Sequence, residues 1–481
     1  MIQDSAKQNK KSRGNIHNEK KFQNATNDKV NMVSQKEQQS NQGSRANPKE
    51  TITQIRDIPV IASYDVVVCG GGPSGFIAAI AAARGGAKVA LIERYGFLGG
   101  MATASLVAPI SVFNYNQRRI VDGIPWEFIE RLIAIEGARE EKPIGNITFS
   151  PEKYKLIAQR MVLEAGVSLY FHSYLTGCKK QGNRLTHIII DNKNGTEAIE
   201  AKYFIDCTGD ADLSYQLGVP MQPMKKELQP ATLIFMLGGV DIDALPMIRH
   251  REQGVNYHDM QMRQILLDLS EKGALPMFGG PWYCGVMENG LALVNMTRTY
   301  ANMSDNRQAT ITECQLREDV FTFIDILKKN VPAFKNAFLV MTAPQTGTRE
   351  TRRIKGVYTL QGEEYINAYN FEDSISRGCH PVDIHSSATN NQRCEFLKDA
   401  AFVPYRCLIA AGFPNLLVGG RAFSADGVSS ASVRVQASVM GLGQAAGAAA
   451  ALCTKHRVDV SDVDIKELRE VLINWGANLN D

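Results

Sequence analysis

The sequence lacks the cysteine spacings that indicate a disulfide framework, a zinc site or an iron–sulfur cluster. Its nine cysteines are dispersed, with no C-x-x-C pair and no Cys/His pattern typical of zinc. An odd, scattered set of cysteines is typical of reduced thiols in the cytoplasm. We therefore predict a cytoplasmic protein without a metal site.

Neither an export signal nor a strong charge bias is present. Residues 1–50 contain no apolar stretch behind a basic region, so nothing in them predicts secretion. The 53 Lys and Arg residues against 50 Asp and Glu residues leave a net charge of +3. Such a balance does not indicate nucleic acid as a partner of the whole protein.

Long hydrophobic runs are also missing. Two uncharged stretches approach the length of a membrane span, residues 66–83 and 435–454. The first is interrupted by the glycines and proline of residues 70–73, and the second consists mostly of Ala, Gly, Ser and Gln, which give little drive for membrane insertion. No membrane span is predicted.

What the sequence does contain is enough apolar material, 44% of its residues, for a large core. Composition and pattern divide the chain into a disordered polar tail (1–55), an α/β domain in two parts (60–215 and 401–455), an inserted α+β domain that we expect to face the substrate (216–400) and a C-terminal segment (456–481). The tail is poor in aromatic residues and cannot bury enough apolar area to order itself.

The first ordered segment has the pattern of a βαβ unit. Residues 64–69 (YDVVVC) are typical of a buried parallel strand, a helix is predicted from about Ser74 to Arg84, and residues 88–93 (KVALIE) form the next strand. Further predicted elements are a helix at 151–165, strands at 167–175, 185–191, 197–205 and 415–419, and a long small-residue helix beginning near Ser432.

Between the first strand and helix lies Gly70-x-Gly72-x-x-Gly75, the spacing of a dinucleotide-binding turn. Gly70 permits the tight turn, Gly72 lets a pyrophosphate approach the backbone, and Gly75 permits close packing of helix on strand. Glu93 ends the second strand, where a carboxylate accepts hydrogen bonds from ribose hydroxyls. This motif alone does not choose between NAD and FAD.

Later segments favour FAD. Glu93 opens an E-x-x-x-x-L-G-G-x-x-T loop, and residues 205–212 read IDCTGDAD. With residues 348–356, 381–385, 403–406, 415–421 and 432–435, the chain resembles the FAD-dependent oxidoreductases of the glutathione-reductase-like superfamily, in particular a large bacterial family. The resemblance implies a doubly wound, Rossmann-like α/β fold. It places at the cofactor Gly70, Gly72, Pro73, Ser74, Gly75, Glu93, Arg94, Gly99, Gly100, Met101, Thr103, Thr208, Gly209, Asp210, Gly420, Arg421, Ser432 and Val433.

Two details of this resemblance matter for the site. Arg421 stands where the wider superfamily has an Asp, so the resemblance implies that it contacts either the pyrophosphate or the substrate. The helix from about Ser432 is expected to point its N-terminus at the flavin, where its positive end stabilises charge on the reduced ring.

Candidates for catalysis lie in the predicted substrate domain. Asp383 and His385 are two residues apart, so in an extended segment they share a face, with His385 as acid/base and Asp383 orienting it. His380 is a weaker candidate. Arg349 and Arg353 would share a face of a strand and suit an acidic substrate; salt-bridged structural arginines are the alternative.

The leading hypothesis is an enzyme that transfers a hydride between FAD and a small polar substrate, which would carry a carboxylate if the arginines bind it. No second nucleotide motif is present, so electrons come from the substrate or from a redox partner protein. The alternatives are a flavin-containing RNA-modification or RNA-binding protein, whose tail would contact RNA, and a non-catalytic FAD-binding scaffold. The sequence does not indicate an oligomeric state.

Overall fold

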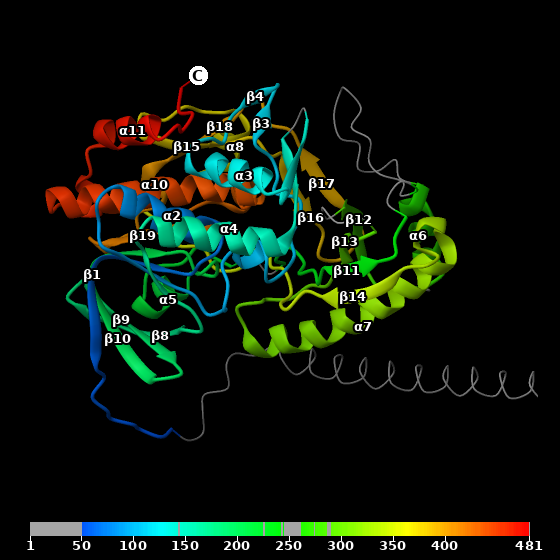
Figure 1. Cartoon of the computed structure of the whole chain (residues 1–481), viewed down its shortest axis with the longest axis horizontal. Coiled ribbons are helices and arrows are strands. Elements are labelled where there is room, and N and C mark those ends of the chain that lie inside the picture. The colour runs from blue at the N-terminus through cyan, green and yellow to red at the C-terminus, as the bar shows by residue number, and fades with distance from the viewer. Residues whose placement is uncertain are drawn as a thin grey trace, which may run out of the picture. The chain divides into compact units, whose positions relative to one another are not determined.

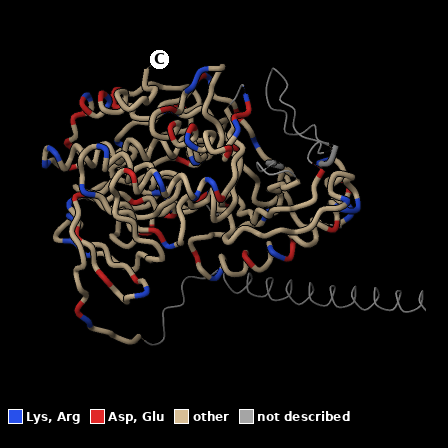
Figure 2. The backbone as a smooth tube through the Cα atoms, in the orientation of Figure 1, with Lys and Arg blue, Asp and Glu red and all other residues tan. Residues whose placement is uncertain are grey.

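The computed structural model describes residues 51–142, 145–224, 227–241, 244, 261–273, 275–285 and 290–480. Most of the predicted polar tail, residues 1–50, lies outside these ranges, and residues 51–57 form neither helix nor strand. Residues Ile58–Asp481 make one compact unit. Basic and acidic residues are interspersed over the described part of this unit (Figure 2).

A seven-stranded sheet organises this unit (Figure 1). Its parallel part has the order β7-β2-β1-β10-β19, and the antiparallel strands β9 and β8 continue from β10. The bounds are β1 (Val60–Cys69), β2 (Val89–Ile92), β7 (Ser168–Tyr170), β8 (Tyr174–Gln181), β9 (Arg184–Asn192), β10 (Gly195–Asp206) and β19 (Leu416–Val418). Sheet and crossover helices confirm the predicted α/β class.

The carboxyl end of β1 and all of β2 are buried on both faces of the sheet, as their continuous apolar runs predict. Alternate residues of β1 enter two different cores: Val66 and Val68 pack on one side, and Val67 and Cys69 on the other. On the first side, helices α2 (Pro73–Arg84) and α10 (Gln436–His456) pack against each other and against the sheet. Helix α5 (Asp212–Leu217) packs on β8 and β10 from the second side.

A second, antiparallel sheet has the order β12-β13-β11-β14 and comes wholly from the predicted substrate region. It is an additional layer beside the nucleotide-binding fold, with β11 (Phe235–Gly238), β12 (Phe278–Gly285), β13 (Ala292–Thr297), β14 (Phe338–Thr342), α6 (Gln261–Glu271) and α7 (Asn306–Asn330). The predicted limits of this domain, 216 and 400, stay a prediction.

Smaller elements complete the described chain. They are η1 (Gly100–Ala102), β3 (Asn114–Tyr115), β4 (Arg118–Arg119), α3 (Ile124–Ala134), β5 (Ala138–Glu141), β6 (Asn146–Phe149), α4 (Pro151–Glu164), η2 (Pro332–Phe334), α8 (Gly362–Ile366), β15 (Ser374–Gly378), β16 (Val382–His385), β17 (Gln392–Glu395), β18 (Ala401–Pro404), η3 (Tyr405–Cys407), η4 (Gly420–Ala422), α9 (Gly427–Val433), η5 (Val460–Asp462) and α11 (Ile465–Asn474).

Two sequence predictions are corrected. The run 167–175 is two strands, β7 and β8, because the chain turns at His172, whose φ is +51°. The helix predicted to begin near Ser432 begins at Gln436; Ser432 instead lies in the last turn of α9. Helix α10 is long and apolar enough to cross a membrane, but 89% of its most apolar window is buried inside the protein, as in a core helix.

Candidate functional site

The glycine-rich turn joins β1 to α2 at the carboxyl edge of the parallel sheet. Gly70 has a φ of +98°, and a Cβ on it would lie 2.4 Å from the carbonyl oxygen of Cys207. A Cβ on Gly75 would lie only 1.8 Å from the carbonyl oxygen of Gly70. These two glycines are therefore required by the fold itself, one for the turn and one for the packing of helix on strand.

Gly72 differs from its two neighbours in the motif. A Cβ there would come no closer than 3.9 Å to another protein atom, the Cα of Gly100. It is the N-cap of α2, no side chain caps this helix, and Pro73 follows. The first N–H groups of the helix and its positive end are thus free for an anion, as the pyrophosphate role predicts.

Glu93 lies directly behind this turn and is 5% exposed. Its Oε2 accepts a hydrogen bond from the Gly71 N–H at 2.7 Å, and its Oε1 accepts one from the Tyr95 N–H at 2.9 Å. Burial raises the pKa of Glu93, while these hydrogen bonds act against the rise. Each oxygen keeps a lone pair, which is what a ribose hydroxyl needs.

The loop after Glu93 packs on the turn through its backbone. The Gly99 N–H donates to the Gly71 carbonyl at 2.9 Å, and a Cβ on Gly100 would lie 2.8 Å from the Cα of Gly72. Thr103 is buried and donates to the Leu98 carbonyl at 2.8 Å. The two predicted residues Gly99 and Thr103 thus shape the loop, while Gly100 and Met101 line the groove beside it.

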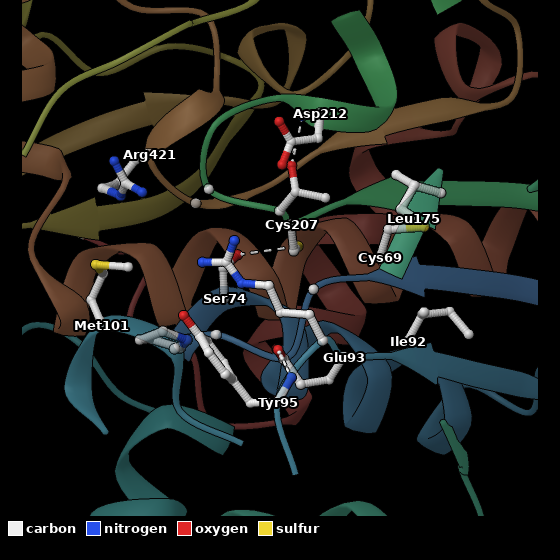
Figure 3. A pocket seen from close by; sticks show the side chains of 18 of the residues that line it. Cys69, Ser74, Ile92, Glu93, Tyr95, Met101, Leu175, Cys207, Asp212 and Arg421 are labelled. Atoms are coloured by element: carbon white, nitrogen blue, oxygen red, sulfur yellow. Dashed lines mark hydrogen bonds between the residues drawn. The ribbon is translucent and has the colours of Figure 1, made fainter. Parts of the chain in front are cut away.

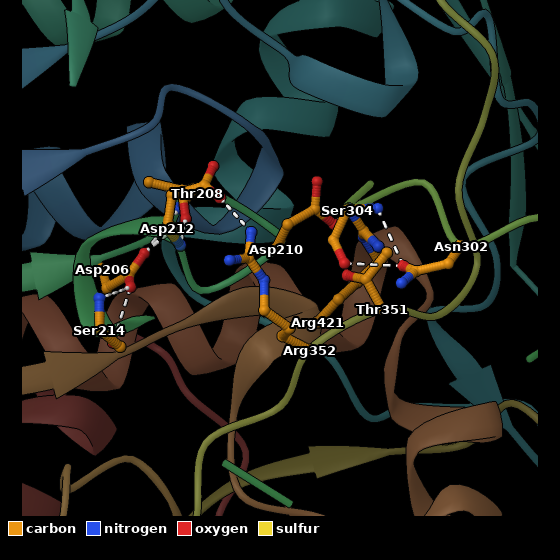
Figure 4. A network of polar contacts seen from close by, with 10 residues as sticks. All are labelled: Asp206, Thr208, Asp210, Asp212, Ser214, Asn302, Ser304, Thr351, Arg352 and Arg421. Atoms are coloured by element: carbon orange, nitrogen blue, oxygen red, sulfur yellow. Dashed lines mark hydrogen bonds and ion pairs between the residues drawn. The ribbon is translucent and has the colours of Figure 1, made fainter. Parts of the chain in front are cut away.

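A second turn follows β10. Asp206 is fully buried and accepts hydrogen bonds from the N–H and hydroxyl groups of both Thr208 and Ser214 (Figure 4). This network holds Thr208 and Gly209 at the wall of the groove. Asp206 therefore has a structural role that was not predicted from the sequence.

Arg421 faces this turn from η4. Its Nη2 lies 3.1 Å from Asp210 Oδ1, and Asp210 also accepts a hydrogen bond from Thr351 (Figure 4). The buried Nη1 of Arg421 has no hydrogen-bond partner. Arg421 thus lines the groove with its Nη1 amino group unpaired, while Asp210 holds Nη2 from behind.

These segments enclose one groove (Figure 3). It contains about 1010 Å³ of space, its open mouth included. Its lining residues that were predicted from the sequence are Gly70, Gly72, Pro73, Ser74, Glu93, Arg94, Gly100, Met101, Thr208, Gly209, Gly420 and Arg421. Its lining residues that were not predicted are Cys69, Ile92, Tyr95, Ser173, Tyr174, Leu175, Cys207, Asp212, Arg434, Gln436 and Val439.

Comparison with known proteins shows which family the chain belongs to. The family model described as FAD dependent oxidoreductase matches residues 65–472, more than four fifths of the chain. The chain belongs to this family of FAD-dependent oxidoreductases. It is therefore an enzyme with FAD as its cofactor rather than a non-catalytic scaffold.

Single relatives are more distant. A segment of 45 residues is 56% identical to dihydrolipoyl dehydrogenase from Trypanosoma brucei brucei, and the match spans 9% of each chain. Similar solved structures include a geranylgeranyl bacteriochlorophyll reductase-like protein from Thermoplasma acidophilum (15% identity, 86% of this chain and 84% of that chain, TM-score 0.45). Another is a flavoprotein/dehydrogenase from Cytophaga hutchinsonii (14% identity, 86% of each chain, TM-score 0.44).

The residues present fit FAD. The open approach at Gly72 leaves room for a diphosphate at the N-terminus of α2, and Glu93 presents lone pairs for a ribose. Ser432 and Val433, however, are buried and do not line the groove. Because α9 ends at Val433, the groove receives Arg434, Gln436 and Val439 from the break between the helices and from the first turn of α10.

The predicted pair Asp383 and His385 does share a face of β16. His385 Nε2 lies 2.8 Å from Asp383 Oδ2, and His385 Nδ1 lies 2.8 Å from Nη2 of Arg298. A guanidinium only donates, so Nδ1 carries no proton and Nε2–H donates to Asp383. Burial, with Arg349 next, lowers the pKa of His385 to about 3. Both of its ring nitrogens are therefore already engaged.

The predicted pair Arg349 and Arg353 is separated. The segment is not a strand, and Arg353 forms a buried ion pair with Glu350 at 2.6 Å and donates to the Ala425 carbonyl. Arg349 instead donates through Nη1 to the Pro230 carbonyl and to Thr232. Arg353 thus has the salt-bridged, structural arrangement that was the alternative to substrate binding. Of the two arginines, Arg349 is the one that lies near His385.

We expect Gly72→Ala to give a folded protein that binds FAD about 30-fold or more weakly. The new methyl group touches no protein atom closely, but it projects where the diphosphate must approach the backbone. Circular dichroism of the FAD-free protein checks the fold, and fluorescence titration with FAD gives the affinity. Gly86→Ala, at a surface turn with a φ of +91°, is the control because it strains the backbone without touching the groove. Unchanged affinity in Gly72→Ala would place the diphosphate elsewhere.

Proposed function

We propose that this enzyme transfers a hydride between FAD and a small polar substrate that carries a carboxylate. The observation that carries the proposal is an excess of positive charge beside the FAD groove. Arg298, Arg349 and Arg434 lie around the Asp383–His385 pair. Among the described residues, the carboxylates that act on Arg434 are Asp383 and Glu350, and Glu350 is already paired with Arg353. Arg434 also lines the groove itself.

The charges in this cluster do not balance. Burial, followed by the neighbouring arginines, lowers the pKa of Arg349 to about 9. Burial, followed by Arg263, lowers the pKa of Arg298 to about 10. Although burial opposes it, His385 and Arg434 hold the pKa of Asp383 well below its usual range, so it stays charged. Buried cations without matching anions are unfavourable, and a bound carboxylate supplies the missing negative charge.

Free donor atoms are available to that carboxylate. Arg349 uses only Nη1 in its described contacts, which leaves Nη2 and Nε. Arg434 uses Nη2 for the Asp383 carbonyl in its described contacts, which leaves Nη1; its Nε also has no partner but is buried away from solvent. Guanidinium groups bind carboxylates with two parallel hydrogen bonds, so these two side chains form the proposed clamp.

Bound FAD supplies an acceptor for a hydride, and the side chains of the protein bind and orient the substrate. The arginines hold the substrate against the groove, and Asp383 with His385 and Arg298 fixes Arg434 in place. The order of the cofactor segments along the chain supports placing the enzyme in the glutathione-reductase-like superfamily. The free cysteines among the described residues support a location in the cytoplasm. A redox partner protein that reoxidises the flavin belongs to the same proposal.

Carboxylate binding to the FAD-loaded enzyme tests this function. Simple carboxylates such as acetate, oxalate and benzoate should perturb the flavin absorbance on titration, and pools of carboxylic acids should bleach it without oxygen. In Arg349→Gln we expect carboxylates to bind at least 10-fold more weakly, because a charge-assisted pair of hydrogen bonds is lost.

The FAD content of Arg349→Gln should not change, since Arg349 does not line the groove. Arg393→Gln is the matched control, because this exposed arginine lies on β17, the strand paired with β16, and pairs with Glu395. Equal carboxylate affinity in wild type and Arg349→Gln would contradict the proposed clamp.

A further inference from the structure

We propose that His380, rather than His385, exchanges the proton with the substrate during hydride transfer. The inference rests on the proposed function and concerns the same site. It also names the substrate class, a carboxylic acid whose oxidised carbon carries a hydroxyl group. The argument depends on the hydrogen bonds that fix the proton on each imidazole ring.

His380 has one nitrogen bound and one free. Its Nδ1 lies 2.7 Å from the Pro381 carbonyl oxygen. A carbonyl oxygen only accepts, so Nδ1 carries the proton and the neutral ring leaves a bare lone pair on Nε2. Nε2 has no hydrogen-bond partner among the described residues. It is also absent from the side-chain atoms that are both fully buried and without a partner. The residue as a whole is only partly buried.

His385 has the opposite arrangement. Arg298 fills the lone pair on its Nδ1, and its Nε2–H is directed at Asp383. Its backbone N–H donates to Gln229, and the edge of its ring contacts Trp282. To take a proton, His385 would have to release one of two charge-assisted hydrogen bonds. We therefore assign His385 a positioning role, through Asp383, on Arg434.

His380 lies next to the FAD groove. Its carbonyl accepts a hydrogen bond from the hydroxyl of Ser432, two residues before Arg434 in the groove wall. The charged groups that act on its ring are Asp383 on β16 and Arg434 after α9. Burial and Arg434 lower the pKa of His380, and Asp383 acts against them, so the ring is neutral at pH 7 and able to accept a proton.

The proposed reaction is balanced with FAD as the oxidant. The C–H bond of the substrate breaks and its electron pair leaves as a hydride to FAD. The O–H bond breaks and its proton goes to His380 Nε2, while the remaining electrons form the C=O bond of the keto acid. The cluster that binds the carboxylate carries excess positive charge, which repels an ammonium group and favours a hydroxyl at the reacting carbon.

Selective ¹⁵N labelling of the eight histidines tests the tautomers without any substrate. In the FAD-loaded enzyme, the spectrum should show a proton on Nδ1 of His380 and on Nε2 of His385, each assigned with its own His→Asn variant. Saturating oxalate should shift the Nε2 signal of His380, because a carboxylate has bound beside it. A proton on Nε2 of His380 at pH 7 would overturn the proposal.

Flavin reduction by 2-hydroxy acids, such as glycolate, lactate, malate and mandelate, tests the role itself. His380→Asn can keep the hydrogen bond to the Pro381 carbonyl but has no group in place of Nε2, so the reduction rate should fall about 100-fold with the oxalate affinity unchanged. In wild type, the flavin reduction rate should fall at low pH as His380 is protonated. This fall should be absent in His380→Asn. In His385→Asn the oxalate affinity should change, because Arg434 loses its support.

The outcomes separate the two proposals. If oxalate binds through Arg349 but His380→Asn keeps the wild-type reduction rate within threefold, the function stands and the role of His380 is wrong. If oxalate binds but only 2-amino acids reduce the flavin, the assigned substrate class is wrong. If no carboxylate binds at all, the proposed function fails, and the substrate class fails with it.

Discussion

Gly443→Ala is expected to lower the free energy of unfolding by about 3 kcal/mol or more, the upper range for one methyl group forced into a packed core. Gly443 lies where α10 crosses α2, and a Cβ there would be 2.1 Å from the backbone carbonyl oxygen of Ser74. Because the obstacle is the backbone of α2, one helix must move away from the other. The move would also displace the glycine-rich turn, so FAD should be lost as well.

A glycine two residues earlier on the same helix provides the control. In Gly441→Ala the new Cβ would meet the hydroxyl of Ser376, which can rotate away. Both variants gain up to about 1 kcal/mol of helix propensity, so the difference between them isolates the contact with α2. Urea unfolding of the FAD-loaded proteins gives the comparison. Equal stabilities would mean that the two helices tolerate a wider separation.

The first half of the nucleotide-binding fold could be predicted because its signals are local. β1, α2 and β2 follow each other within 33 residues, and their ends are marked by glycines. The break between α9 and α10 has no such mark. Residues 432–435 include no Gly or Pro, yet Val435 is extended (φ −69°, ψ 151°) and is the N-cap of α10. Tertiary packing sets this break, so a helix of small residues was predicted to begin four residues too early.

The site shows the same division between local and distant signals. Glycines and Glu93 could be placed in the groove because their spacing along the chain specifies their role. Tyr174 and Leu175 could not, because they reach the groove from the start of β8 and have no pattern of their own. The sequence did indicate that Asp383 and His385 face each other. It could not indicate Arg298, which approaches His385 from 87 residues away and fixes its tautomer.

Arg353, which was predicted to bind the substrate, forms a buried ion pair with Glu350, so its substitution should have a large effect on stability. Arg353→Met is expected to lower the free energy of unfolding by about 3–5 kcal/mol, the usual effect of removing one partner of a buried ion pair. Glu350 would keep only its hydrogen bond from the Gln229 N–H while its charge remained buried. Urea unfolding of the FAD-loaded protein is the measurement.

The double variant Glu350→Gln/Arg353→Met tests whether the unpaired buried charge of Glu350 is what destabilises Arg353→Met. The introduced glutamine side chain can still accept the hydrogen bond from the Gln229 N–H but carries no charge, so the double variant should regain most of the stability. Oxalate affinity in the double variant should equal that of wild type, whereas Arg349→Gln weakens it. A double variant that is stable but no longer binds oxalate would show that Arg353 takes part in carboxylate binding. The proposed carboxylate clamp would then include Arg353.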